Sequence, residues 1–113
     1  MRYTTISMSK QPLQPSDPIC SSIFEMFGDK WTLRIVSVLR DGEMRFKEIE
    51  KNLSINSATL SARLKKLEEI GAVARSEETI DKLSVTYKLT KSGNDLLPIY
   101  DGIVKFGQKI VTT

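Results

Sequence analysis

The chain has 113 residues, of which 40% are hydrophobic and 27% charged, and its formal net charge is +3, a composition that suits one small folded domain. It has no histidine, a single cysteine, and no Gly-rich phosphate loop or nucleophile motif, which argues against an enzyme and against a bound metal or cofactor. No stretch approaches the ~20 apolar residues of a membrane span, and the start lacks the apolar run of a signal peptide, so we expect a cytoplasmic protein without membrane contact.

The first predicted element is a helix that ends near Phe27. Residues 1–16 are rich in Ser, Thr, Gln and Pro without an apolar period, and we expect a flexible arm ahead of a domain at 17–113. The dipeptide Asp17-Pro18 is typical of an N-cap followed by a first helical position. Gly28 should end the helix with a positive φ angle.

The second and third predicted helices differ in their polarity. Asp29 can cap a second helix over about 30–40, and its nearly all-apolar sequence, with Trp31 near its start, indicates a central position in the core. A short third helix over about 46–52 has one apolar and one charged face.

A fourth helix is predicted over about 57–70. Asn56 is a suitable N-cap, Gly71 a suitable end, and leucines at helical spacing form one face. The break between the third and fourth helices is short, so residues 46–70 have the arrangement of a helix-turn-helix.

After Gly71 the apolar period changes from helical spacing to alternation. This change predicts a β-hairpin over about 72–89, and a hairpin directly after a helix-turn-helix is a wing. Thr90 can cap a last helix over about 91–111, strongly apolar, which Pro98 should kink. The predicted fold class is therefore mainly α with a small β-hairpin wing, a winged helix-turn-helix with additional N- and C-terminal helices.

Several short motifs resemble the HxlR family of winged helix-turn-helix regulators, which is related to MarR-type regulators. The resemblance covers about residues 18–107 and rests on the order and spacing of these motifs: Gly28-Asp29-Lys30-Trp31, Arg45-Phe46 with Ile49, Leu60 with Arg63-Leu64 and Leu67-Glu68, Gly71 with Val73, Tyr87-x-Leu89-Thr90-x-x-Gly93, and Leu96-Leu97-Pro98. It implies a homodimeric bacterial or archaeal regulator, usually a repressor, that pairs through its first and last helices.

Two features depart from that family. Some members sense oxidants or electrophiles through a cysteine just before the first helix, but the matching position here is Pro18, and Cys20 lies two residues later. The family often has an arginine where this chain has Ser84. The wing is acidic, and Lys82, its only basic residue between the strands, is a candidate DNA contact. Such a wing either touches little DNA or disfavours non-specific DNA, and the sequence leaves both interpretations open.

The fourth helix is the predicted DNA reader. With its leucines inward, its outer surface carries small and hydroxyl residues that can approach base edges, followed by cations that can reach phosphates. The predicted contact residues in this helix are Ser57, Ala58, Thr59, Ser61, Ala62, Lys65 and Lys66. The alternative is an ordinary solvated helix face.

Three further cations are candidate DNA contacts. Arg45 and Lys47 open the third helix, where main-chain N–H groups and the dipole favour a phosphate. Arg63 lies at the edge of the outer surface of the fourth helix. Its side chain either contacts DNA or packs on the domain with its guanidinium paired to a carboxylate.

The first and last helices carry more apolar residues than one small domain can cover, which predicts a homodimer. The predicted interface residues are Ile23, Phe24, Phe27, Leu97, Tyr100, Ile103, Val104, Phe106 and Ile110. Cys20 is a candidate redox site in the first turn of the first helix, where the dipole favours a thiolate; the alternative is a small buried side chain near the interface.

The sequence as a whole predicts a sequence-specific regulator that binds double-stranded DNA, a homodimeric repressor of a pseudo-palindromic operator. The alternatives are a protein-interaction module with weak or no DNA binding, and a regulator with thiol-based redox sensing. A small-molecule or oxidant effector is a candidate partner, but no polar cluster identifies it.

Overall fold

The computed structural model describes residues 12–77 and 84–111. Most of the expected arm at 1–16 therefore lies outside the described residues, as do Lys82 and the acidic residues Glu78 and Asp81 of the wing. In chain order the elements are α1 (Pro18–Phe27), α2 (Thr32–Val38), β1 (Met44–Arg45), α3 (Phe46–Leu53), α4 (Ser57–Glu69), β2 (Val73–Glu77), β3 (Val85–Leu89), the 3₁₀ helix η1 (Gly93–Leu96) and α5 (Leu97–Val111).

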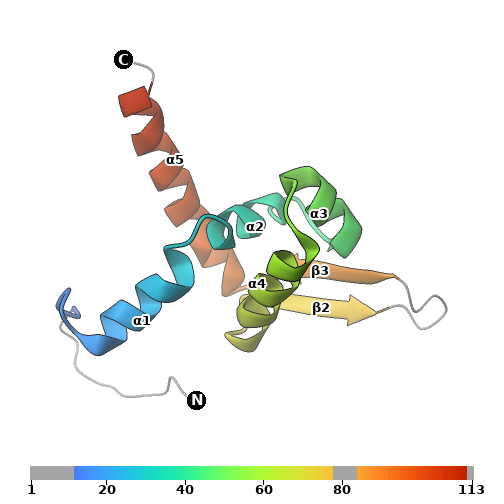
Figure 1. The fold of residues 1–113 in the computed structure, drawn as a ribbon, viewed down its shortest axis with the longest axis horizontal. Helices are drawn as coiled ribbons and strands as arrows, with labels where there is room; N and C mark the ends of the chain where they lie inside the picture. Colours follow the sequence, from blue (N-terminus) through green and yellow to red (C-terminus); the bar gives the residue numbers. More distant parts are fainter. Residues whose placement is uncertain (1–11, 78–83, 112–113) are drawn as a thin grey trace.

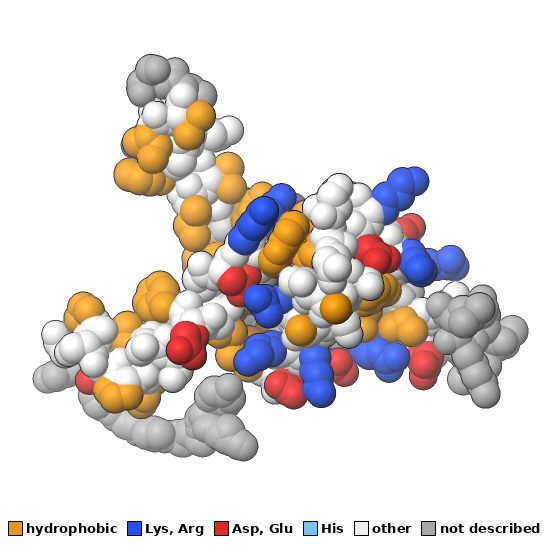
Figure 2. Space-filling view, in the orientation of Figure 1, with side chains coloured by type: hydrophobic (Ala, Val, Ile, Leu, Met, Phe, Trp, Pro, Cys, Tyr) orange, Lys and Arg blue, Asp and Glu red, His pale blue; other side chains and the backbone are white. Residues whose placement is uncertain are grey.

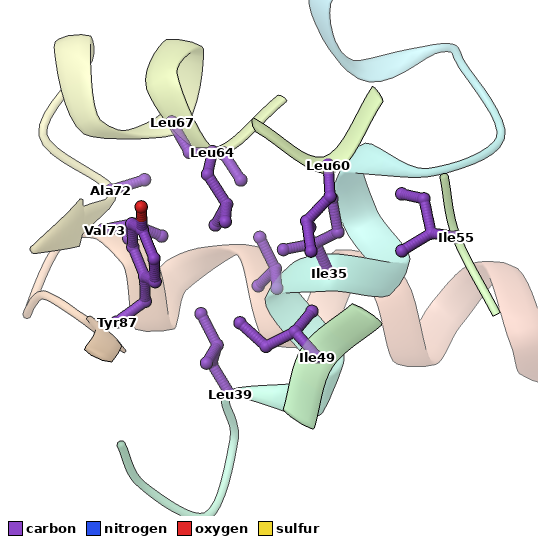
Figure 3. Packing of buried hydrophobic residues seen from close by; sticks show 11 residues of the cluster. Ile35, Leu39, Ile49, Ile55, Leu60, Leu64, Leu67, Ala72, Val73 and Tyr87 are labelled. Atoms are coloured by element: carbon purple, nitrogen blue, oxygen red, sulfur yellow. The ribbon is translucent and has the colours of Figure 1, made fainter. Parts of the chain in front are cut away.

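The core lies where α2, α3 and α4 meet the strands. Leucines of α4 point toward Ile35 of α2 and Leu39 just after it, and Tyr87 of β3 closes one end (Figure 3). The buried hydrophobic residues of the described chain are Ile35, Val36, Leu39, Ile49, Ile55, Leu60, Leu64, Leu67, Ala72, Val73 and Tyr87. None of them belongs to α1 or α5.

The wing is part of a three-stranded antiparallel sheet with the order β1-β3-β2. In β3, Leu89 pairs with Val73 at one end and Val85 with Glu77 at the other. β1 adds a strand that the sequence did not predict, with Met44 opposite Tyr87. It joins the start of α3 to the wing, so the helix-turn-helix and the wing share one sheet.

The turn between α1 and α2 differs from the prediction in two respects. Gly28 has a φ angle of −88°, so the expected positive φ is wrong. Glycine is needed here for space instead, because a Cβ atom would lie 2.5 Å from the Phe24 carbonyl oxygen. The second helix is also shorter than predicted, because Asp29 accepts hydrogen bonds from the Trp31 and Thr32 backbone N–H groups, and these bonds delay its start to Thr32.

The last helix also begins later than predicted. Thr90 caps a turn through its hydroxyl oxygen, which accepts from the Gly93 N–H at 3.0 Å, and η1 follows. Pro98 is the second residue of α5, so the expected kink in mid-helix is wrong. A proline fits the first turn of a helix, where its missing N–H has no partner to lose.

α1 and α5 extend away from the winged body on the side opposite the wing tip (Figure 1). Arg40, in the turn after α2, pairs with Asp101 of α5, with 2.6 Å between Nη2 and Oδ1. No helix in 12–77 or 84–111 has the length and apolar character needed to cross a membrane.

Candidate DNA-binding surface

Helix α4 has a start fixed by its cap and an inner face fixed by leucines. The Asn56 side-chain oxygen accepts from the N–H groups of Ala58 at 2.8 Å and Thr59 at 3.2 Å. The leucines of the inner face are buried, which holds the helix firmly on the core. Gly71, with a φ angle of 81°, ends the helix in the left-handed region that favours glycine.

The outer face of α4 has the composition that the sequence predicted. Its predicted contact residues Ser57, Ala58, Ser61, Ala62, Lys65 and Lys66 are exposed, Thr59 is half-buried beside them, and the exposed Glu68 and Glu69 follow at the end of the helix. We call the seven predicted contact residues the α4 row. The small side chains at the start of α4 allow the helix to approach base edges closely. The two lysines that follow can reach phosphates of the DNA backbone.

The start of α3 is less open to a phosphate than its cations suggest. Arg45 and Lys47 are exposed. However, the Glu48 carboxylate accepts the Arg45 N–H at 2.8 Å and places a negative charge in the first turn. A phosphate would therefore share this helix start with a carboxylate, and the two flanking cations would have to supply most of the attraction.

Arg63 turns toward the protein. Its Nε lies 3.2 Å from Asp29 Oδ2, and the side chains are 32% and 22% exposed. Of the two interpretations left open by the sequence, this is the one in which the guanidinium pairs with a carboxylate. Burial raises the pKa of Asp29, but hydrogen bonds from Thr32 and Trp31 and the charge of Arg63 outweigh it and hold that pKa below its ordinary value.

The wing supplies a cation that sequence analysis missed. Arg75 on β2 lies opposite Tyr87 on β3, and a hydrogen bond with the Tyr87 side chain raises the pKa of the guanidinium. Arg75 also lies 3.6 Å from Glu77, so its charge is partly offset. The cross-strand pairing places these residues together, and only the strand register could have revealed it. Ser84, where the resembling family often has arginine, is buried.

Charged side chains gather over the face that α4 presents, while apolar side chains cover the projecting α1 and α5 (Figure 2). Acidic residues lie among the basic ones, so the face is mixed rather than uniformly positive. No group of three or more metal-ligating side chains occurs within 12–77 and 84–111.

The apolar surface of α1 and α5 is large. Phe24 is 67% exposed, Phe106 64% and Ile103 58%. The exposed hydrophobic residues of the two helices are Ile19, Ile23, Phe24, Ile99, Ile103, Val104, Phe106, Ile110 and Val111.

Three residues predicted for the dimer interface are less exposed, and so less available to contact a second chain. Tyr100 is half-buried, and Phe27 and Leu97 pack against the core of their own chain. Each lies at the end of its helix nearest the winged body, where the core can reach it. Cys20 lies in the first turn of α1, as predicted, and is half-buried.

Residues 26–113 match the family described as HxlR-like helix-turn-helix, which is most of the chain. The chain belongs to the HxlR-like helix-turn-helix family. It is 37% identical over 86 residues to an HTH-type transcriptional regulator of Halalkalibacterium halodurans, covering 74% of this chain and 76% of that one. It is 34% identical over 85 residues to an HTH-type transcriptional regulator of Mycobacterium bovis, and spans only 54% of the length of that relative.

Solved structures of other regulators have the same fold as this HxlR-like chain. The reduced form of the transcriptional regulator YodB from Bacillus subtilis superimposes with a TM-score of 0.69 and 32% identity, covering 82% of this chain and 92% of that one. A mutant of MarR from E. coli in complex with operator DNA superimposes with a TM-score of 0.58 and 26% identity, covering 69% and 55% of the two chains.

Proposed function

We propose that this protein is a transcriptional regulator that binds double-stranded DNA in a sequence-specific manner, with the α4 row in the major groove. The observation that carries the proposal is the row itself, small residues and then Lys65 and Lys66, exposed on a helix whose opposite face is buried. The relatives named as HTH-type transcriptional regulators and the operator complex of MarR support it.

The test is a selection from a random duplex library with the purified protein. Affinity for the selected sequence should fall linearly with salt on a double-logarithmic plot, since each phosphate contact releases counterions. A scrambled duplex should bind at least ~10³-fold more weakly. Failure to enrich any sequence, together with binding that ignores salt, would favour a protein-interaction module.

We propose further that the working unit is a homodimer joined by α1 and α5 and that it represses transcription. The exposed apolar surface of both helices supports pairing, and two-fold symmetry would present two recognition helices about 34 Å apart, one turn of DNA. The selected sequence should therefore be a pseudo-palindrome. Placed over a promoter in a reporter strain, it should lower expression when the protein is present.

Thiol-based sensing is a second candidate. Structures of diamide-treated and quinone-bound YodB superimpose on this chain at 31% identity, with TM-scores of 0.68 and 0.65. Cys20 is half-buried, so a reagent can reach it. Two such thiols would form one intermolecular disulfide, with two protons and two electrons passing to the oxidant.

The redox candidate is tested on the selected DNA. Diamide should change the affinity of the wild type and leave Cys20→Ser unchanged, and dithiothreitol should reverse the change. Equal sensitivity in the two proteins would exclude Cys20 as the sensor.

A further inference from the structure

The recognition helix α4 and the segment that leads out of α1 meet at one ion pair. Asp29 lies in the turn between α1 and α2, and Arg63 lies in the middle of α4. The 3.2 Å contact between Arg63 Nε and Asp29 Oδ2 therefore joins the reading helix to the turn that follows the projecting helix α1.

The carboxylate of this pair also accepts hydrogen bonds from the first residues of the α2 segment. Oδ1 accepts from the backbone N–H groups of Trp31 at 2.6 Å and Thr32 at 2.8 Å. Oδ2 accepts from the Thr32 hydroxyl at 2.7 Å, and Thr32 itself is buried in the start of α2. Asp29 thus ties the turn that follows α1 to the start of α2, and its ion pair with Arg63 ties the same turn to α4.

The position of the Arg63 guanidinium depends on Asp29. Arg63 Nε is buried and makes no hydrogen bond of good geometry with any described residue, so the charge of Asp29 is what compensates it. A buried cationic N–H without compensation is unfavourable, and with a neutral side chain at position 29 the guanidinium should leave its place.

Among the described residues, few contacts set the direction of α1. None of its residues is buried, and within 12–77 and 84–111 its last residue, Phe27, is the one that packs against the core. A cleft of about 420 Å³ separates its middle from α4, with Ser22, Glu25 and Met26 on one side and Arg63 and Lys66 on the other. Asp29 also lines this cleft, at the end where the two sides join.

We propose that Arg63 is a positioning residue whose ion pair with Asp29 fixes the angle between α1 and the recognition helix α4. If α1 helps to join two chains, as the proposed function requires, the same pair sets the spacing of the two recognition helices in the dimer. Arg63 then favours DNA with correctly spaced half-sites without touching it.

The direct test measures the geometry of one chain and needs no DNA. Ser21→Cys and Ser61→Cys, both at exposed positions, place spin labels on α1 and α4 in a Cys20→Ser background. Labelled chains are diluted with unlabelled ones so that only distances within a chain are recorded. Asp29→Asn and Arg63→Ala should each broaden the distance distribution.

The matched control is Thr32→Val, which removes a hydrogen bond to the same carboxylate but keeps the ion pair. It should lower stability and leave the distribution narrow. A distribution for Asp29→Asn that is as narrow as that of the wild type would overturn the proposal. This measurement decides the inference even if the protein selects no DNA, in which case the proposed function alone fails.

DNA binding gives an independent readout that distinguishes positioning from direct contact. With positioning, Asp29→Asn and Arg63→Ala both weaken binding to the paired half-sites by about five- to tenfold and leave the salt slope and the single half-site affinity unchanged. A direct phosphate contact has the opposite signature and would overturn the proposal: Asp29→Asn would strengthen binding by freeing Arg63, and Arg63→Ala would lower the slope by about one.

Discussion

At the scale of single residues, different members of the α4 row should set the general affinity for DNA and the preference among DNA sequences. Lys66→Ala should weaken binding to every duplex and lower the salt slope by about one, because one phosphate contact is lost. Lys105→Ala on α5 removes the same charge outside the helix-turn-helix and should leave the slope unchanged. Equal slopes for Lys66→Ala and wild type would place the phosphates elsewhere.

The hydroxyls of the row should act on preference instead. Thr59→Ala or Ser61→Ala should change the ranking of DNA sequences by about 1–3 kcal/mol at single base positions, with the salt slope unaffected. Repeating the library selection with each variant measures this. An unchanged consensus for both variants would show that α4 does not read bases.

Asp29 should make stability depend on pH in the acid range. Its pKa is below the ordinary value of 3.8 in the folded protein, so its ionised form stabilises the fold. That contribution is complete above the unfolded pKa and is lost as the pH falls through the lower folded pKa. In urea unfolding from pH 6 to pH 2, the gap between wild type and Asp29→Asn should therefore narrow below about pH 4. A constant gap would contradict this.

At the scale of elements, the root of the wing depends on the close approach of Gly93 to Ala72. A Cβ atom at Gly93 would contact the Ala72 carbonyl oxygen and come within 2.9 Å of its carbonyl carbon, both backbone atoms that cannot move aside easily. Gly93→Ala should cost about 1–3 kcal/mol in urea unfolding. Gly102→Ala on α5, where a Cβ meets nothing within 4 Å, should be neutral or slightly stabilising. Equal stability of the two variants would contradict the close approach.

Elements specified by local signals were predictable, and those specified by distant partners were not. The Asn56 cap, the leucine spacing and Gly71 all lie within α4, so the sequence predicted its bounds almost to the residue. β1 has only two residues and exists because it pairs with β3, more than forty positions later in the chain. Pro98 was misplaced because a proline suits the start of a helix as well as a kink within one.

The candidate site shows the same division. The exposed residues of the α4 row follow from helical geometry alone, and the sequence predicted them. The partner of Arg63 is 34 positions away and the partner of Arg75 is across a sheet, so neither pairing could be read from spacing. Phe27 and Leu97 were assigned to the interface because both are large and apolar. The sequence does not show how the helix ends meet the core, and it is this meeting that partly buries the two side chains.

At the scale of the whole molecule, the exposed apolar surface of α5 predicts self-association. Ile99, Ile103, Phe106 and Ile110 recur at helical spacing on one exposed face, and each large side chain left in water forgoes about 1.5–3 kcal/mol. Ile103→Asp and Phe106→Asp should each give a monomer in sedimentation at micromolar concentration, with DNA affinity reduced at least tenfold.

Lys105→Asp is the matched control for the dimer, since it places a carboxylate on the same helix without removing apolar surface. It should remain dimeric. A wild type that sediments as a monomer and still binds a single half-site tightly would exclude the proposed assembly.

Because α1 and α5 have no buried residues, their backbone should open to solvent faster than that of the core helices. In a single chain, amide hydrogens of the two outer helices should exchange with solvent by local fraying. Amide hydrogens of α2 and of the inner turns of α4 should exchange only when the whole chain unfolds. Association would slow exchange chiefly in the outer helices. A nascent chain could thus complete its winged body before it meets a partner, and folding would precede assembly rather than require it.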